Sequence, residues 1–206
     1  MFRPPSGPED SAEFERPESA TLFCAVGTLG RGVNKRVDVC IRAVAAAREG
    51  GADVGLVVCG EGSQRAELER LAGELAVGEH VSFLGMRDDV PRVLAACDAF
   101  CHGAPFEPFG IVCIEAMATG LPVIVPDAGG MMEAVDDGET GLVYHVLDHG
   151  GLAAAMARLD ADAELRRSMG LAARRAAEER FSVPDYVRRL YSLYGLGSGT
   201  DGEAGA

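Results

Sequence analysis

Apolar residues follow two kinds of pattern along the chain. Short, mostly apolar runs bounded by glycine or polar residues are typical of buried strands, and they occur at 21–26, 54–59, 81–84, 99–102, 122–125 and 142–144. Elsewhere, apolar residues recur every three or four positions, which predicts helices. The expected helices cover 37–48, 89–96, 110–119, 151–159, 163–180 and 184–194. One further helix is expected directly after Ser63, which can cap it.

The order of these elements predicts the fold class. Strands that alternate with helices at this spacing form a parallel sheet through right-handed crossovers, with helices on both faces. We therefore expect an α/β protein, a single Rossmann-like domain of about six strands over residues 21–194. Residues 1–20 and 195–206 lack hydrophobic periodicity and are expected to be a disordered linker and a flexible tail. Ligands of such folds bind at the carboxyl ends of the strands, in this chain the loops 27–36, 60–63, 85–88, 102–110 and 126–133.

Composition narrows the classes of partner. The formal net charge of −13 argues against nucleic acid as the main partner, because contact with phosphate backbones needs a basic surface. No apolar run approaches the roughly 20 residues of a membrane span, and the polar N-terminus has no signal-peptide pattern. We therefore expect a cytoplasmic protein. Six cysteines without a CxxC pair are interpreted as reduced, buried thiols, and four scattered histidines make a metal site improbable.

One segment, EPFGIVCIEAMAT at residues 107–119, carries the strongest chemical signal. After Gly110 it is apolar on nearly every side, which predicts a buried helix, and Glu115 is the only charge in that helix. A buried carboxylate persists most easily where a ligand or a fixed donor satisfies it. Because a carboxylate accepts two hydroxyl donors at once, Glu115 suits the two hydroxyls of a ribose. The alternative is a core helix with one salt-bridged glutamate.

The start of the same helix suits a phosphate. Free backbone N–H groups and the positive end of the helix dipole lie at Gly110, and Glu107 lies just before them on the loop. Sites for ribose, phosphate and sugar would then follow one another along a single short segment.

A basic loop adds a second phosphate signal. Lys35 is the only lysine of the chain, and Arg31 and Arg36 flank it in the loop GTLGRGVNKRVD. A compact ammonium reaches a phosphate as a point charge. The alternative is a solvated basic loop. The turns GEG at 60–62 and GG at 129–130 follow strands, but the chain has neither a GxGxxG nor a Walker pattern, so a dinucleotide or P-loop site is not predicted.

These segments together resemble the C-terminal, nucleotide-sugar-binding domain of the family-four glycosyltransferases of the GT-B fold. The resemblance covers residues 21–194 and includes VGTLGRGVNKRVDVCIRA, VVCGEGSQRAELERLA, VSFLGMRDDVPRVLAACDAF and EPFGIVCIEAMATGLPVIVPDAGGMMEAVDDGETGLV. Glu107 and Glu115 fit the E-x7-E motif of that family. The resemblance implies a retaining, metal-independent transfer of a sugar from a nucleotide-diphosphate sugar, without a cofactor.

The resemblance also implies a role for each matching residue. Glu115 would hold the ribose, Glu107 would contact the transferred sugar, and Lys35 would neutralise the leaving diphosphate. Further contacts to the donor would come from the backbone of Gly110 and Ile111, from Met86 and Arg87 at the base, and from the loop of Gly129, Gly130 and Glu133. The family usually has an arginine where this chain has Thr28, and Arg31 is the candidate to replace it.

The resemblance further implies that the acceptor half is absent from this chain. Phe2-Arg3-Pro4 is similar to the hinge where the C-terminal domain of the family begins, so we expect a missing N-terminal acceptor domain or a partner subunit. In the family the last helix, 184–194 here, leans onto that other domain, and we expect its apolar side chains to be exposed. Three hypotheses stay open. The chain is half of an enzyme, a stand-alone or degenerate nucleotide-sugar-binding module, or a sugar-nucleotide epimerase. The EPFG motif argues against the epimerase.

Overall fold

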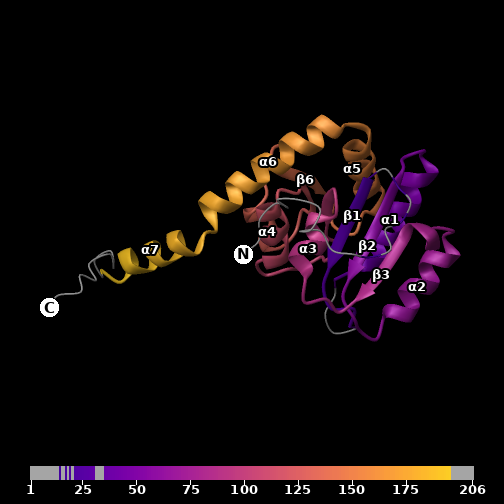
Figure 1. Ribbon diagram of the computed structural model, residues 1–206, viewed down its shortest axis with the longest axis horizontal. Helices are drawn as coiled ribbons and strands as arrows, with labels where there is room; N and C mark the ends of the chain where they lie inside the picture. The colour runs from indigo at the N-terminus through magenta and orange to yellow at the C-terminus, as the bar shows by residue number, and fades with distance from the viewer. Residues whose placement is uncertain (1–13, 15–16, 18, 20, 31–34, 196–206) are drawn as a thin grey trace.

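A parallel sheet of six strands forms the centre of the molecule (Figure 1). The computed structural model of the protein describes residues 14, 17, 19, 21–30 and 35–195. The strands lie in the order β3-β2-β1-β4-β5-β6. Their bounds are β1 Thr21–Val26, β2 Val54–Cys59, β3 Val81–Gly85, β4 Ala99–Cys101, β5 Val123–Pro126 and β6 Gly141–Tyr144. The predicted fold class is therefore confirmed.

Both faces of the sheet are buried, which explains why its strands are continuous apolar runs. Successive side chains of β1 point to opposite faces, so Phe23 packs into one hydrophobic cluster and Leu22 and Cys24 pack into the other. The first cluster is covered by α1 (Val37–Glu49), α2 (Arg65–Glu74) and α5 (His149–Ala161). The second cluster lies under α3 (Val90–Ala95), α4 (Ile111–Thr119) and α6 (Ala163–Arg180).

The starts of α2 and α5 differ from the predictions in how the helices are capped. Ser63 does not cap α2: the helix begins at Arg65 after Gln64, and the structure gives no side-chain cap there. In contrast, α5 begins at His149 instead of residue 151, because the Asp148 carboxylate accepts a hydrogen bond from Gly150 N and so caps the helix earlier. Two short 3₁₀ turns, η2 (Gly78–His80) and η3 (Gly130–Glu133), also belong to the domain body.

The last helix leaves the body of the domain. Helix α7 (Val183–Leu193) follows α6 and points away from the sheet (Figure 1). Its apolar side chains are exposed, as predicted: Tyr186 is 63% exposed and Leu193 82%.

The flanking segments lie mostly outside the described residues, including Phe2-Arg3-Pro4 and the tail 196–206. Of the residues expected to form a disordered linker, Phe14 packs against the second hydrophobic cluster and Pro17 is buried. All six cysteines are free and buried, as predicted. Within the described part of the chain, no helix is both long and apolar enough to cross a membrane.

Candidate functional site

The strand order places a crevice between the ends of β1 and β4. The chain runs from β1 to β2 on one side of the sheet, and from β4 to β5 on the other. At such a switch point the loops after the two strands diverge and leave a crevice outside their carboxyl ends, where ligands of open α/β sheets bind. In this protein the two loops carry Lys35 and Glu107.

Lys35 and Glu107 form an ion pair across this crevice. They are 72 positions apart in the chain, and the Lys35 ammonium donates a hydrogen bond to Glu107 Oε2. Both side chains are mostly shielded from solvent, with 20% and 17% of their surface exposed. Burial by itself raises the pKa of Glu107. The hydrogen bond and charge of Lys35, together with His102 and the Gly110 backbone, outweigh burial and lower that pKa below its usual value.

His102 lies beneath the ion pair, at the end of β4. Its ring is 2% exposed, and its Nε2 atom lies 3.6 Å from Glu107 Oε2. Burial, followed by the positive charge of Lys35, lowers the pKa of His102 to about 4, so the ring is neutral at pH 7. Sequence reasoning assigned no role to His102. The available signal was that this polar residue ends an otherwise apolar predicted strand.

Two glycines support the loop that carries Glu107. Gly110 precedes α4 with φ 73°, a left-handed conformation that favours glycine. Gly130 N donates a hydrogen bond to Glu107 O at 2.8 Å. A Cβ atom at Gly130 would lie 2.0 Å from Pro108 O, so only glycine permits this approach of the two loops. The Gly129-Gly130 turn therefore positions the Glu107 loop, a role that sequence reasoning did not foresee.

Helix α4 is only half buried, which corrects the prediction of a helix buried on every side. Cys113 and Met117 are fully buried, but Ile111 is 64% exposed. Glu115 lies on the partly exposed side and lines the crevice. Its carboxylate has no hydrogen bond or ion pair within the described residues, and burial raises its pKa. The helix packs one face on the sheet and turns the other face to the crevice, which its uniform apolar sequence does not reveal.

The crevice opens into a hollow of about 830 Å³ that we call the β1/β4 hollow. It brings together five of the predicted site residues: Lys35, Glu107, Gly110, Ile111 and Glu115. Sequence reasoning noted Thr28 and missed several other lining residues, because short apolar and turn residues carry no chemical signal. The missed ones are Val26, Gly27, Asp88, Val90, Pro91, Pro108, Phe109 and Val112.

The remaining predicted residues are not among those that line the β1/β4 hollow in the described part of the chain. Met86 is 84% exposed and Arg87 forms an ion pair with Asp89, just before the lining residue Val90. Glu133 lines a separate small hollow beyond Phe109. Arg31 lies outside the described residues. A contact of these four residues with a ligand stays a prediction.

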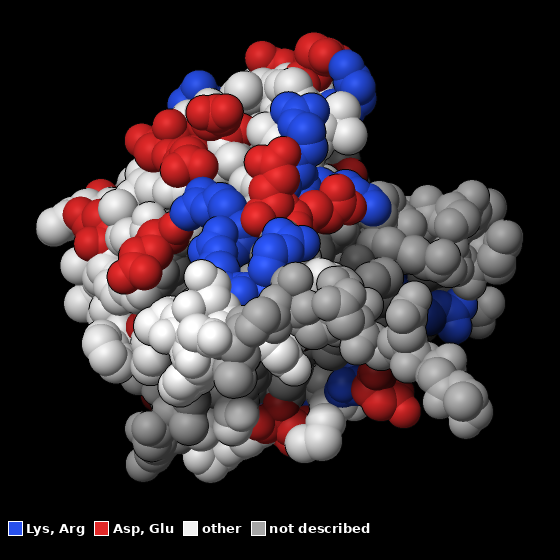
Figure 2. All heavy atoms as spheres, turned by 90° about the vertical axis from the view of Figure 1, so that its left-hand side faces the viewer, with Lys and Arg blue, Asp and Glu red and all other residues white. Residues whose placement is uncertain are grey.

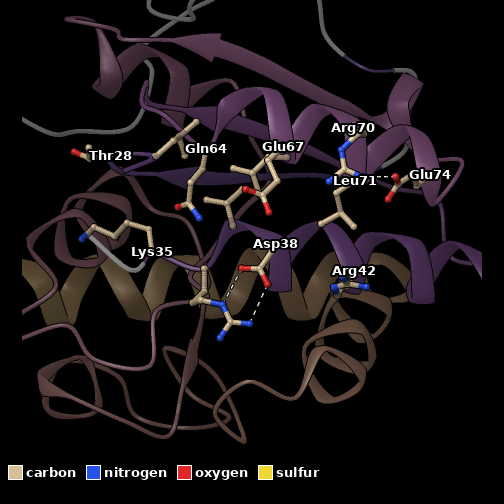
Figure 3. A pocket seen from close by; sticks show the side chains of 13 residues that line it. Thr28, Lys35, Asp38, Arg42, Gln64, Glu67, Arg70, Leu71 and Glu74 are labelled. Atoms are coloured by element: carbon tan, nitrogen blue, oxygen red, sulfur yellow. Dashed lines mark hydrogen bonds and ion pairs between the residues drawn. The ribbon is translucent and has the colours of Figure 1, made fainter. Parts of the chain in front are cut away.

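A second hollow adjoins Lys35 on its other side (Figure 3). It measures about 370 Å³ and lies between α1 and α2. Its charged side chains largely neutralise one another, because Arg36 pairs with Asp38 and Arg70 pairs with Glu74. Figure 3 shows the Lys35 ammonium pointing away from Asp38 and Arg42. The ammonium pairs with Glu107, which lines the β1/β4 hollow and not this second hollow.

Charges elsewhere on the surface are mixed. On the face shown in Figure 2, basic side chains lie beside acidic ones. Three ion pairs of this kind involve α6: Arg167–Glu164, Arg174–Glu178 and Arg180–Asp136. Among the residues that the structure describes, no group of three histidine, cysteine, aspartate or glutamate side chains is placed to share a metal ion.

Solved structures with the same fold define the class of this protein. HepE from Anabaena, crystallised with UDP-glucose, superimposes with a TM-score of 0.76 at 28% identity, over 87% of this chain and 50% of HepE. The C-terminal domain of LpcC, a group 1 glycosyl transferase from Francisella tularensis, matches 88% of this chain and 96% of that domain with a TM-score of 0.77. At 21% identity, the second match shows the fold alone. The domain is therefore the Rossmann-like C-terminal domain of a GT-B glycosyltransferase.

The family follows from the sequence match. Residues 7–176 match the family Glycosyl transferases group 1, and the chain belongs to this family. It is 34% identical over 142 residues to the N-acetyl-alpha-D-glucosaminyl L-malate synthase of Bacillus anthracis, a match that covers 69% of this chain and 37% of the synthase. It is 33% identical over 212 residues to the D-inositol 3-phosphate glycosyltransferase of Salinispora tropica, covering 94% of this chain and 43% of that enzyme. The chain thus spans less than half the length of these relatives.

Proposed function

We propose that this chain is the donor-binding half of a retaining glycosyltransferase that transfers a sugar from a nucleotide-diphosphate sugar to an acceptor. The observation that carries the proposal is the β1/β4 hollow, which Lys35, Glu107 and Glu115 line together with the start of α4. The solved HepE structures with UDP and UDP-glucose support a nucleotide sugar as the donor.

The geometry suggests a role for each group. The diphosphate would lie between the Lys35 ammonium and the first N–H groups of α4, where fixed positive charge stabilises negative charge that develops on a leaving group. Glu115 would accept hydrogen bonds from the ribose hydroxyls, and Glu107 would contact the sugar. In the transfer, the bond from the anomeric carbon to the diphosphate oxygen breaks and a bond to the acceptor oxygen forms. The hydroxyl proton of the acceptor leaves with the diphosphate.

Binding of a nucleotide is the direct test. Thermal unfolding of the chain should be measured with UDP, GDP, ADP and their sugar nucleotides at millimolar concentration. A ligand at 100 times its dissociation constant stabilises a protein by about 2.7 kcal/mol, which gives a clear rise in Tm. If none of these compounds raises the Tm, the site does not bind nucleotide diphosphates and the proposal fails.

We further propose that sugar transfer needs an acceptor domain or a partner subunit. The greater length of the relatives supports this proposal. Holding both reactants in register can contribute about 7–11 kcal/mol to catalysis, and a donor domain alone holds only one of them. Transfer should therefore require a separately expressed acceptor domain. Turnover by this chain alone at about 1 per second or faster would contradict a half enzyme.

A stand-alone nucleotide-sugar-binding module is the second candidate, and one observation favours it. Thr28, which lines the β1/β4 hollow, occupies the position where the resembled family usually carries an arginine. A hydroxyl stabilises a diphosphate less than a guanidinium does. If nucleotide sugars bind but no acceptor domain restores transfer, this second candidate replaces the first.

A further inference from the structure

We propose that His102 is a positioning residue for Glu107: when Lys35 turns to a diphosphate, the neutral imidazole of His102 takes its place as hydrogen-bond donor to Glu107 Oε2. The inference rests on the proposed function, because it needs Lys35 to exchange Glu107 for a bound donor. It assigns a task to a buried side chain that no other part of the proposed function uses.

The backbone and ring of His102 are firmly held. His102 N donates to Ile124 O at 3.0 Å, and Tyr144 donates its hydroxyl proton to His102 O at 2.9 Å. The imidazole stacks on Phe100, with 6.1 Å between ring centroids and 17° between the ring planes. A residue fixed in this way at the end of a central strand is a rigid support for a neighbouring loop.

The free nitrogen of this ring faces one acceptor. His102 Nε2 is buried and has no hydrogen-bond partner in the part of the chain that the structure describes. Its neighbour Glu107 Oε2 is 3.6 Å away, beyond hydrogen-bond distance, and the same oxygen already accepts a bond from Lys35. Unpaired buried polar atoms are rare because each one costs stability. A shift of about 0.6 Å would bring the two atoms within hydrogen-bond distance.

The protonation states suit this bond. Two charged groups act on the ring, Lys35 and Glu107, and burial together with Lys35 keeps the imidazole neutral at pH 7. A neutral imidazole has one N–H donor, and an ionised carboxylate can only accept. The tautomer with hydrogen on Nε2 is therefore the one that can serve Glu107. Once the ammonium of Lys35 moves to a diphosphate, this N–H is a side-chain donor next to Glu107 Oε2, and it adds to the contact from the Gly110 backbone.

Nuclear magnetic resonance of ¹⁵N-histidine-labelled protein tests the exchange of partners. The chain has four histidines, and His102→Gln identifies the signal of His102. We expect an Nε2-protonated ring whose N–H resonance moves downfield when the sugar nucleotide with the largest Tm shift, among UDP-glucose, GDP-mannose and ADP-glucose, is added. In Lys35→Met the same downfield resonance should be present without any nucleotide, because Glu107 has lost its first partner.

The Lys35→Met spectrum separates failure of this inference from failure of the proposed function. If no nucleotide binds but Lys35→Met shows the downfield signal, His102 can replace Lys35 as the donor to Glu107, and it is the proposed function that fails. If nucleotides bind and the His102 signal moves in neither experiment, or if the ring carries its hydrogen on Nδ1, the inference is overturned.

Variants supply a second readout. We expect His102→Leu to weaken the best sugar nucleotide about ten-fold, as for loss of a hydrogen bond to a charged group, and His102→Gln, which keeps an N–H donor, to recover most of that loss. In a Glu107→Gln background His102→Leu should cost less than two-fold, because the carboxylate that it supports is gone. The exposed His149, at the start of α5, gives the matched control His149→Gln, with unchanged affinity. An equal loss from His102→Leu in both backgrounds would show a purely structural role.

Discussion

Glu107 and Glu115 line the same hollow, yet the protein holds them in opposite ways. Glu107 lies on a loop, accepts a hydrogen bond from Lys35 and has a lowered pKa. Glu115 lies on α4, has no side-chain partner among the described residues and has a raised pKa. The fold thus gives the Glu107 carboxylate a hydrogen-bond donor without a ligand, whereas the Glu115 carboxylate is left to accept hydrogen bonds from a ligand. This difference indicates that the surroundings of Glu107 are preformed and that Glu115 is a contact point for a ligand.

The largest expected effect comes from removing the partner of Glu107. Lys35→Met should weaken binding of the preferred nucleoside diphosphate by about 10- to 100-fold, since hydrogen bonds to charged groups contribute about 1.5–3 kcal/mol. Isothermal titration calorimetry measures the change. Arg42→Met is the matched control, because Arg42 lines only the neighbouring hollows, and it should leave affinity unchanged. Equal losses in both variants would mean that only the general positive charge matters.

A ribose test addresses Glu115 alone. Glu115→Gln should weaken ribonucleotides about ten-fold, because the amide accepts from two hydroxyls less well than a carboxylate. Binding of the 2′,3′-dideoxy nucleotide, measured by the same titration, should hardly change. If both ligands lose affinity equally, Glu115 supports the helix and does not contact the ribose.

The two carboxylates should also affect folding stability with opposite signs. The lowered pKa of Glu107 means that its ionised form stabilises the fold above the unfolded pKa, and this gain disappears as pH falls through the folded value. Glu107→Gln should therefore cost about 1–3 kcal/mol at pH 7, and this cost should shrink as pH falls through the lowered pKa of Glu107. Glu115 has a raised pKa, so its ionised form destabilises the fold until pH falls through that value.

Urea unfolding of both variants at pH 7 measures this contrast. Glu115→Gln should be neutral or stabilising by less than about 1 kcal/mol at pH 7. A loss of stability in Glu115→Gln as large as that in Glu107→Gln would show that Glu115 has a partner within the fold, and the contrast between the two sites would disappear.

The smallest expected effect is that of a chelator. The positive charge at the β1/β4 hollow comes from Lys35 and from the start of α4, so nucleotide affinity should be the same with and without excess EDTA, as measured by calorimetry. Strict dependence on magnesium or manganese would show that the diphosphate is held differently.

Much of the fold could be predicted from local patterns. The apolar runs located all six strands, and helical periodicity located α1, α6 and α7 to within one residue at each end. Errors arose where two local effects oppose each other. At α5, two glycines disfavour a helix, but the cap from Asp148 starts the helix before them. Helix α4 was placed correctly, but its burial was not, because an apolar composition does not reveal which face meets the sheet.

The sequence by itself determined which residues have the chemistry for a donor site. The spacing of Glu107 and Glu115, the single lysine Lys35 and the glycine before α4 are properties of short segments, and local sequence suffices to recognise them. Only the tertiary structure decided that Lys35 and Glu107, 72 positions apart, form a pair, and that His102 lies buried beneath them. These contacts depend on β1 and β4 being neighbours in the sheet. Strand order depends on how all helices and strands bury their apolar faces together, and no single segment contains that information.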